Sequence, residues 1–203
     1  VHMMISDPAK YIDRFIAAGA DMITFHREAV EDPKPLIYRI KDAGVRASMA
    51  ISPATPVEEV LPCLSMLDMV LVMTVVPGFG GQKLMPETLD KVRALRHSID
   101  ETGLDTDIEV DGGISADNTG LVTSAGANVI VAGSAIFGSQ RPRQRRRFSS
   151  RLLRKHFRGG SFPQGFSRAM GRAPARRTPR ALPRWAFRVH SAGGLPHRAS
   201  HAR

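Results

Sequence analysis

Short apolar runs alternate with segments of helical periodicity over residues 1–140, and this alternation restricts the fold more than any other feature. The pattern contains no hairpin signal, so each strand must return to the sheet through a helix, and the sheet is predicted to be all-parallel. The apolar runs predict strands at 21–25, 46–51, 69–75, 107–110 and 128–132. The helical segments predict helices at 8–18, 35–43, 56–64, 86–101 and 116–125.

An all-parallel α/β sheet is either open and doubly wound or closed into a barrel. We favour the barrel, because glycine-rich stretches follow the last strands and no G-x-G-x-x-G sequence follows the first. If residues 1–5 are the end of a strand, six βα units are visible, whereas a closed barrel has eight. The expected fold is therefore a partial (β/α)8 TIM barrel that lacks the first two βα units.

Charge divides the chain into two parts. Residues 141–203 contain 17 Arg, one Lys, six Pro and no acidic residue, a net charge of +18, whereas residues 1–140 carry −8. We expect 1–140 to be a partial TIM-barrel domain and 141–203 to be a basic, low-complexity, disordered tail. Such a tail would bind nucleic acid non-specifically through its arginines.

Cysteine content and hydropathy indicate the compartment. Cys63 is the single cysteine, which excludes an internal disulfide and fits a reducing environment. No apolar run approaches the ~20 residues needed to span a bilayer, and the first residues lack the features of a signal peptide. We expect a soluble, cytoplasmic protein with no membrane partner.

Asp111 is the first candidate for chemistry. It ends the apolar run Ile108-Glu109-Val110 and is followed by Gly112 and Gly113. A carboxylate at the carboxyl end of a barrel strand is poorly suited to packing but well placed for proton transfer or metal ligation. Asp111 could instead cap the next helix, although Ser115 or Asp117 suits that role better.

Three loops after successive strands are rich in glycine, and their backbones can approach a ligand closely. Together these loops predict a phosphate clamp, to which Ser134 adds a hydroxyl donor. The candidate residues are Gly78, Phe79, Gly80, Gly81, Gly112, Gly113, Gly133 and Ser134.

His2 and His26 lie at candidate strand ends, where an imidazole can bind a divalent metal. A lone histidine is more often structural, and we favour that interpretation for His26. Met4 and Met73 lie on strands as core residues, although thioethers can also line a metal site.

The ordered motifs resemble those of ribulose-phosphate 3-epimerases. The most diagnostic are Pro77-Gly78-Phe79-Gly80-Gly81-Gln82 and Glu109-Val110-Asp111-Gly112-Gly113-Ile114, and the runs at 2–5, 23–29 and 131–137 agree. The resemblance implies that residues 1–140 are the sugar-phosphate epimerase domain, a (β/α)8 barrel that interconverts D-ribulose 5-phosphate and D-xylulose 5-phosphate in the pentose phosphate pathway and the Calvin cycle. It also implies a divalent metal, either iron, zinc, manganese or cobalt.

By this resemblance, Asp111 is an acid/base and a metal ligand, and His2 is a second metal ligand. The substrate would contact both residues and the glycine loops, while Met4 and Met73 would line the metal site. One acid/base and one histidine ligand of the family lie in a His-x-Asp-x-Met-Asp-Gly motif that this sequence does not contain. We therefore expect epimerase activity to be impaired.

Two other functions remain open. One is a related sugar-phosphate 3-epimerase, for example one acting on allulose 6-phosphate. The other is a non-catalytic nucleic-acid-binding protein that acts through the arginine-rich tail. A homo-oligomer is compatible with either, and the sequence does not identify the metal.

Overall fold

The computed structural model describes residues 1–137 and 186–188. Within these residues a single sheet contains seven strands, all parallel, whose order across the sheet is their order along the chain. The strands are β1 (His2–Met3), β2 (Met22–His26), β3 (Arg46–Ile51), β4 (Met69–Met73), β5 (Asp107–Asp111), β6 (Val129–Val131) and β7 (Ala186–Arg188).

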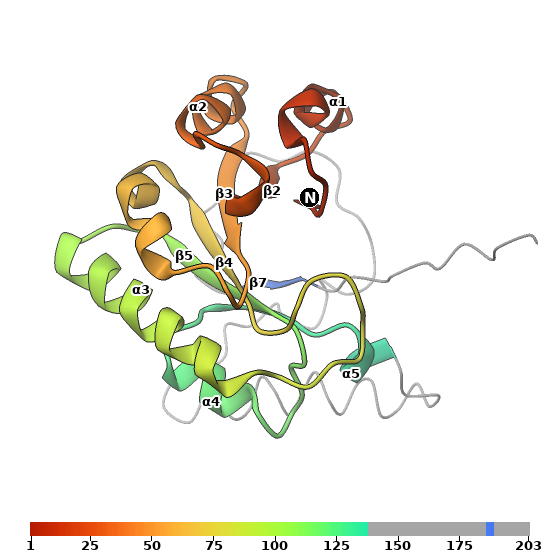
Figure 1. Cartoon of the computed structure of the whole chain (residues 1–203), viewed down its shortest axis with the longest axis vertical. Helices are drawn as coiled ribbons and strands as arrows, with labels where there is room; N and C mark the ends of the chain where they lie inside the picture. Colours follow the sequence, from red (N-terminus) through yellow and green to blue (C-terminus); the bar gives the residue numbers. More distant parts are fainter. Residues whose placement is uncertain (138–185, 189–203) are drawn as a thin grey trace, which may run out of the picture.

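Helices connect the successive strands and lie around the outside of the curled sheet (Figure 1). The α-helices are α1 (Ile12–Ala17), α2 (Lys34–Asp42), α3 (Leu89–Thr102), α4 (Thr119–Ser124) and α5 (Ser134–Phe137). The 3-10 helices are η1 (Pro8–Lys10), η2 (Arg27–Ala29), η3 (Val57–Glu59), η4 (Leu61–Met66) and η5 (Pro86–Thr88).

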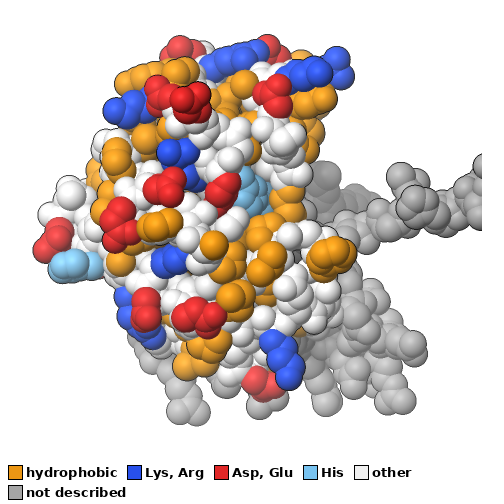
Figure 2. Space-filling view, in the orientation of Figure 1, with side chains coloured by type: hydrophobic (Ala, Val, Ile, Leu, Met, Phe, Trp, Pro, Cys, Tyr) orange, Lys and Arg blue, Asp and Glu red, His pale blue; other side chains and the backbone are white. Residues whose placement is uncertain are grey.

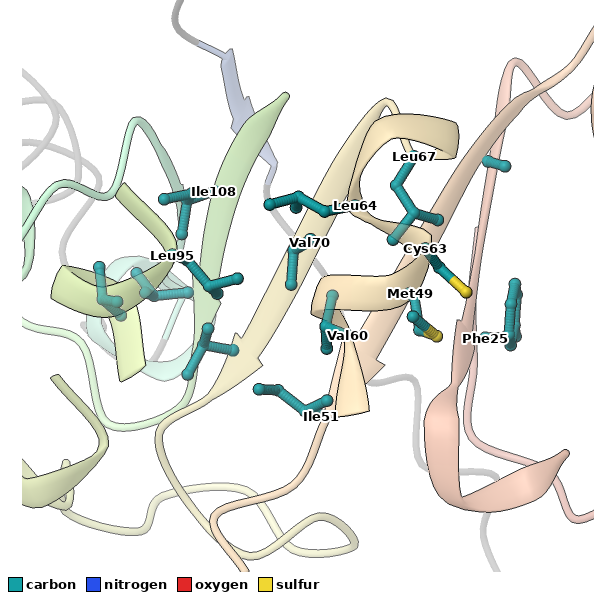
Figure 3. Packing of buried hydrophobic residues seen from close by; sticks show 14 of the residues in the cluster. Phe25, Met49, Ile51, Val60, Cys63, Leu64, Leu67, Val70, Leu95 and Ile108 are labelled. Atoms are coloured by element: carbon teal, nitrogen blue, oxygen red, sulfur yellow. The ribbon is translucent and has the colours of Figure 1, made fainter. Parts of the chain in front are cut away.

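The main hydrophobic core lies between the outer face of the sheet and the helices. Alternate strand residues such as Phe25, Met49 and Val70 face outwards into this layer, where Cys63 and Leu95 pack against the sheet (Figure 3). Burial of each large side chain stabilises the fold by about 1.5–3 kcal/mol. The burial of Cys63 also raises the pKa of its thiol, so this residue is a core side chain rather than a nucleophile.

The inner face of the sheet is more polar. Strand alternation turns Thr24 and His26 of β2, Ser48 of β3, and Glu109 and Asp111 of β5 away from the helix-facing core. Thr24 and Ser48 are fully buried, and their hydroxyls have no hydrogen-bond partner among the described residues. The inner face therefore carries the groups from which a site can be built.

The predicted strands and their parallel arrangement are confirmed, with boundaries that differ by one or two residues. The predicted helix at 56–64 is instead two short 3-10 helices, η3 and η4. Pro62 explains the difference, because it has no N–H to continue an α-helical ladder. The predicted helix at 116–125 begins later, at Thr119, because Ser115 N donates to Asn118 Oδ1 in a turn before it.

Most of the basic segment, including its predicted boundary at 140/141, lies outside the described residues, so its disorder and its nucleic-acid binding stay predictions. Within that segment, Ala186–Arg188 forms β7 beside β6, a strand that the sequence did not predict. No helix among the described residues has both the length and the apolar character required to cross a membrane.

Candidate active site

The carboxyl ends of β4, β5 and β6 lie at one edge of the sheet. The strand register aligns Met73 with Asp111 and Asp111 with Val131, so the loops after these strands start at the same level. The three glycine-containing loops that the sequence singled out therefore leave the same edge as Asp111. In parallel α/β proteins this edge is the usual position of a ligand site.

Asp111 and His2 meet across the inner face, although four strand pairings separate β1 from β5. His2 Nδ1 lies 4.0 Å from Asp111 Oδ2, with the His2 side chain 5% exposed and that of Asp111 26% exposed. The pair therefore has one buried partner and one that solvent or a ligand can reach. The structure brings together these two predicted residues, which lie 109 positions apart in the sequence.

His26 lies next to His2, at the end of β2. The two Nε2 atoms are 2.8 Å apart, and the rings stack with centroids 5.0 Å apart and planes inclined by 19°. The other nitrogen of His26, Nδ1, lies 3.3 Å from Glu28 Oε2. His26, which the sequence favoured as structural, thus contacts the predicted metal ligand His2.

Glu28 is held by several hydrogen-bond donors. Its Oε1 accepts a hydrogen bond from Ser52 N at 2.8 Å and another from the Thr55 hydroxyl. Burial alone would raise the pKa of Glu28, but the hydrogen bonds from His26, Thr55 and Ser52 outweigh it and hold the pKa far below its usual range. Glu28 is therefore an ionised carboxylate at neutral pH.

Lys91 of α3 fixes the segment that supplies those donors. Its Nζ donates to the carbonyl oxygens of Ser52 at 3.0 Å, Pro53 at 2.6 Å and Thr55 at 2.6 Å. Burial lowers the pKa of Lys91, whereas the nearby Glu28 carboxylate acts in the opposite direction. The ammonium group thus satisfies the Pro53 and Thr55 carbonyls and adds a second donor to Ser52 O, which also accepts from Thr55 N.

Replacing Lys91 by methionine is expected to destabilise the protein by about 1–3 kcal/mol, because the Pro53 and Thr55 carbonyls lose their donor while Ser52 O keeps only Thr55 N. The effect is measured as a lower urea midpoint with an unchanged slope. Lys34→Met is the matched control, since Lys34 is exposed at the start of α2. Equal stability of the two variants would show that the Lys91 contacts do not stabilise the loop.

Gly112 and Gly113 form a tight connection directly after Asp111. Their φ angles are +126° and +64°, which side chains with a Cβ rarely adopt. A Cβ on Gly112 would lie 2.4 Å from the Val75 side chain, and one on Gly113 would lie 2.2 Å from Leu84 N. The Thr74 hydroxyl donates to Gly112 O at 2.6 Å, so the loops after β4 and β5 are locked together.

The loop after β4 carries the remaining glycines. Gln82 Nε2 donates to Val76 O at 2.7 Å and to Phe79 O at 2.9 Å, which closes the loop into a compact turn. Phe79 at its tip is 83% exposed. In the space-filling view, a histidine surface near the middle of the face lies between acidic side chains and a broad hydrophobic area (Figure 2).

The other predicted residues fall around this edge. Gly133 and Ser134 follow β6, and Ser134 is the first residue of α5, a helix of four residues. Met73 lies on the inner face of β4 and is buried. The prediction that Met4 is a core residue on a strand is wrong, because β1 ends at Met3 and the Met4 side chain is largely exposed. The sequence missed Glu28, Thr74 and Lys91; the spacing His26-x-Glu28 was the one signal for the first of these.

The distance between His2 and Asp111 is relevant to metal binding. Imidazole nitrogen and carboxylate oxygen bind divalent ions at about 2.0–2.2 Å, so two ligands of one ion lie roughly 3–4 Å apart. The 4.0 Å separation is at the upper end of this range. No cluster of three His, Cys, Asp or Glu residues suited to a metal occurs in the described part of the chain. The pair fits two positions of a coordination shell.

Comparison with known proteins identifies the family. Residues 1–137 match the model of the ribulose-phosphate 3 epimerase family. The chain belongs to this family. The epimerase-family chain is 46% identical over 154 residues to ribulose-phosphate 3-epimerase of Candida glabrata, covering 76% of this chain and 61% of the relative.

Two further relatives are also named ribulose-phosphate 3-epimerase. The match to ribulose-phosphate 3-epimerase of Escherichia coli K12 is 46% identical over 137 residues and covers 68% of this chain and 61% of that protein. The cytoplasmic isoform of Oryza sativa is 48% identical over 145 residues, with coverages of 70% and 62%. The epimerase-family chain thus spans about three fifths of the length of these curated relatives.

Solved structures support the barrel type of fold. The 3-hexulose-6-phosphate synthase of Salmonella typhimurium aligns with a TM-score of 0.56 and 25% identity, covering 75% of this chain and 71% of that one. Tryptophan synthase of Mycobacterium tuberculosis aligns with a TM-score of 0.51 and 15% identity, covering 72% and 57%. The second match shows a shared fold alone.

Proposed function

We propose that this protein binds D-ribulose 5-phosphate or D-xylulose 5-phosphate and that Asp111 moves the proton at C3. Membership of the epimerase family supports the substrate class. The observation that carries the proposal is the position of Asp111 at the carboxyl end of β5, 4.0 Å from His2 and directly before the Gly112-Gly113 turn.

Inversion at C3 requires removal of a proton next to the C2 ketone and its return to the opposite face. The Asp111 carboxylate is the acid/base for one face, since it is reachable by a ligand and lies at the edge of the inner face. The enediolate that forms between the two steps carries negative charge on the C2 and C3 oxygens. A partly buried position strengthens any hydrogen bond or charge that stabilises it.

A divalent cation, when bound, supplies positive charge beside these oxygens. His2 and Asp111 are the residues that would hold it, and Met73 would face the same interior. Iron, zinc, manganese and cobalt all accept a mixed nitrogen and oxygen ligand set. His2 additionally orients Asp111 through their close approach.

The substrate phosphate is proposed to bind at the three glycine loops. Close approach there is possible because Gly78, Gly81, Gly112 and Gly113 have positive φ angles and no side chain. Gly80, Gly133, Ser134 and the Phe79 backbone complete the proposed contacts. The compact turn closed by Gln82 supports this role, because it fixes the loop before a ligand arrives.

The test is exchange and inversion at C3 in D2O, with the full chain and added Mn2+, Co2+, Zn2+ or Fe2+. We expect deuterium to enter C3 of ribulose 5-phosphate or xylulose 5-phosphate faster than with heat-treated protein. Allulose 6-phosphate, assayed in parallel, tests the related 3-epimerase alternative. No exchange into any of these sugars, under conditions where the protein is folded, would refute the proposed function.

We further propose a cytoplasmic location, which the name of the Oryza sativa relative supports. Nucleic-acid binding by residues 141–203 and homo-oligomer formation stay predictions. Deleting 141–203 and repeating a salt-dependent binding assay with RNA would test the first of these.

A further inference from the structure

We propose that Thr74 is a positioning residue for the reaction at Asp111, because it holds the backbone that carries both Asp111 and the glycine loops. All three of its polar groups bond to segments that reach the candidate site. Its N–H donates to Asp111 O at 2.8 Å, its hydroxyl donates to Gly112 O at 2.6 Å, and its carbonyl accepts from Met85 N at 2.9 Å. These four residues are here called the Thr74 junction. The inference rests on the proposed function and adds to it a residue that places the acid/base relative to the glycine loops.

Burial shows that the Thr74 hydroxyl has a specific partner. Thr74 follows β4 directly and is fully buried. Buried polar groups are almost always hydrogen-bonded, and this hydroxyl reaches a backbone carbonyl of the neighbouring connection after β5. Valine has nearly the same shape as threonine and would fill the same space, but it has no donor for Gly112 O. The hydrogen bond is therefore what distinguishes threonine from an apolar residue at this position.

The first contact of Thr74 orients Asp111. The register pairs Met73 with Asp111, and the bond from Thr74 N to Asp111 O lies at the carboxyl end of this ladder. The backbone on the two sides of a Cα atom determines the direction of its Cα–Cβ bond. By holding the Asp111 carbonyl, Thr74 therefore helps to aim the carboxylate, whose Oδ2 lies 4.0 Å from His2 Nδ1.

The second contact restrains the glycine turn. Gly112 is the first residue beyond β5, and its φ of +126° belongs to the wide conformational range that glycine alone adopts readily. The hydroxyl of Thr74 holds the Gly112 carbonyl. Because the peptide unit is planar, a fixed carbonyl also fixes the N–H of Gly113. The hydroxyl thus restrains the most adaptable point between Asp111 and the proposed phosphate contacts.

The third contact joins the two ends of the loop after β4. Met85 follows the stretch that contains Gly78–Gly81, and its N–H donates to Thr74 O. The same stretch lies against the β5 turn, since a Cβ on Gly113 would lie 2.2 Å from Leu84 N. A change at Thr74 therefore displaces the acid/base and the glycine loops relative to each other. A displacement of 1 Å between reacting groups can slow a reaction by about 100-fold.

The test uses Thr74→Val, which replaces the hydroxyl by a methyl group and keeps the backbone N–H and carbonyl. The Gly112 carbonyl loses this donor and is expected to turn towards water, since an unsatisfied carbonyl is costly. We expect deuterium entry at C3, with saturating sugar phosphate and Mn2+, to be about 10- to 100-fold slower than in the unmodified protein. Thr74→Ser keeps the hydroxyl and is expected to exchange at close to the unmodified rate.

Thr106→Val is the matched control, because it removes an equivalent bond at the opposite end of the same two strands. Thr106 directly precedes β5, is buried, and donates from its hydroxyl to Leu67 O at 3.1 Å, just before β4. We expect both valine variants to have lower urea midpoints, but only Thr74→Val to exchange slowly. Equal slowing of the two, an unchanged rate in Thr74→Val, or no recovery in Thr74→Ser would overturn the positioning role.

Amide hydrogen exchange of the full chain, measured by NMR without substrate or metal, gives the second readout. The amides of position 74 and Met85 both donate within the Thr74 junction. We expect them to exchange faster in Thr74→Val than in Thr106→Val, and as slowly in Thr74→Ser as in the unmodified protein. Equal amide rates in the two valine variants would overturn the inference. Absence of C3 exchange in the unmodified protein would refute the proposed function, whereas the amide rates would still decide whether the hydroxyl holds the junction.

Discussion

Asp111→Asn is expected to slow deuterium entry at C3 of ribulose 5-phosphate or xylulose 5-phosphate by about 10^2- to 10^4-fold. This loss corresponds to roughly 3–5 kcal/mol of transition-state stabilisation. Asparagine has nearly the same size as aspartate but cannot take up a proton, so the shape of the site is kept while the proposed proton transfer is lost. The measurement is mass-spectrometric deuterium incorporation with saturating metal and sugar phosphate.

Asp117→Asn is the control for this experiment. Asp117 lies in the same connection after β5 but is exposed, and its replacement removes the same charge. We expect its exchange rate to equal that of the unmodified protein. Equal rates in the two variants, with both folded by circular dichroism, would remove Asp111 from the proposed mechanism.

Gly113→Ala is expected to destabilise the fold by about 2–5 kcal/mol. A left-handed backbone costs an L-residue roughly 1–2 kcal/mol, and forcing an extra methyl group into a tight contact costs about 1–3 kcal/mol. The new Cβ would lie 2.2 Å from Leu84 N, which is backbone and cannot rotate away. The loop after β4 must therefore shift, and the site edge with it. Urea unfolding measures the loss.

Gly103→Ala separates the cost of the left-handed backbone from the cost of the close contact at the new Cβ. Gly103 at the end of α3 has φ +66°, close to the +64° of Gly113, but nothing lies within 4 Å of its Cβ position. Its replacement is expected to cost only the ~1–2 kcal/mol of the left-handed conformation. If Gly113→Ala proved no more destabilising than Gly103→Ala, the proposed packing of the β5 turn against Leu84 would be wrong.

The fold followed closely from the sequence because strand and helix signals are local. Continuous apolar runs such as Met69–Met73 predicted parallel strands buried on both faces, and all six strands of residues 1–137 were located. Pro62 was the main source of error, since its apolar neighbours kept helical spacing while its missing N–H prevented an α-helix. The short strand β7 has no comparable pattern and was not foreseen.

The sequence predicted those site residues that can be recognised from their residue type and their position at the end of a strand. Asp111 before two glycines and His2 at a strand end were recognised, and they do approach each other. The contact between His2 and His26 was not predicted, because it depends on the register and curvature of the sheet. Lys91 was missed for a similar reason: its three acceptors are backbone carbonyls, which have no sequence signature.

The order of the strands makes the His2–Asp111 distance sensitive to small changes in the twist of the sheet. Each of the four pairings from β1 to β5 adds a small rotation, and the distance between the two side chains reflects their sum. A slight change in twist at any one pairing therefore displaces β1 relative to β5 by more than it displaces the two strands of that pairing. Substitutions in the core beneath the helices, remote from every reactive atom, can in this way change the His2–Asp111 distance and slow the proposed reaction.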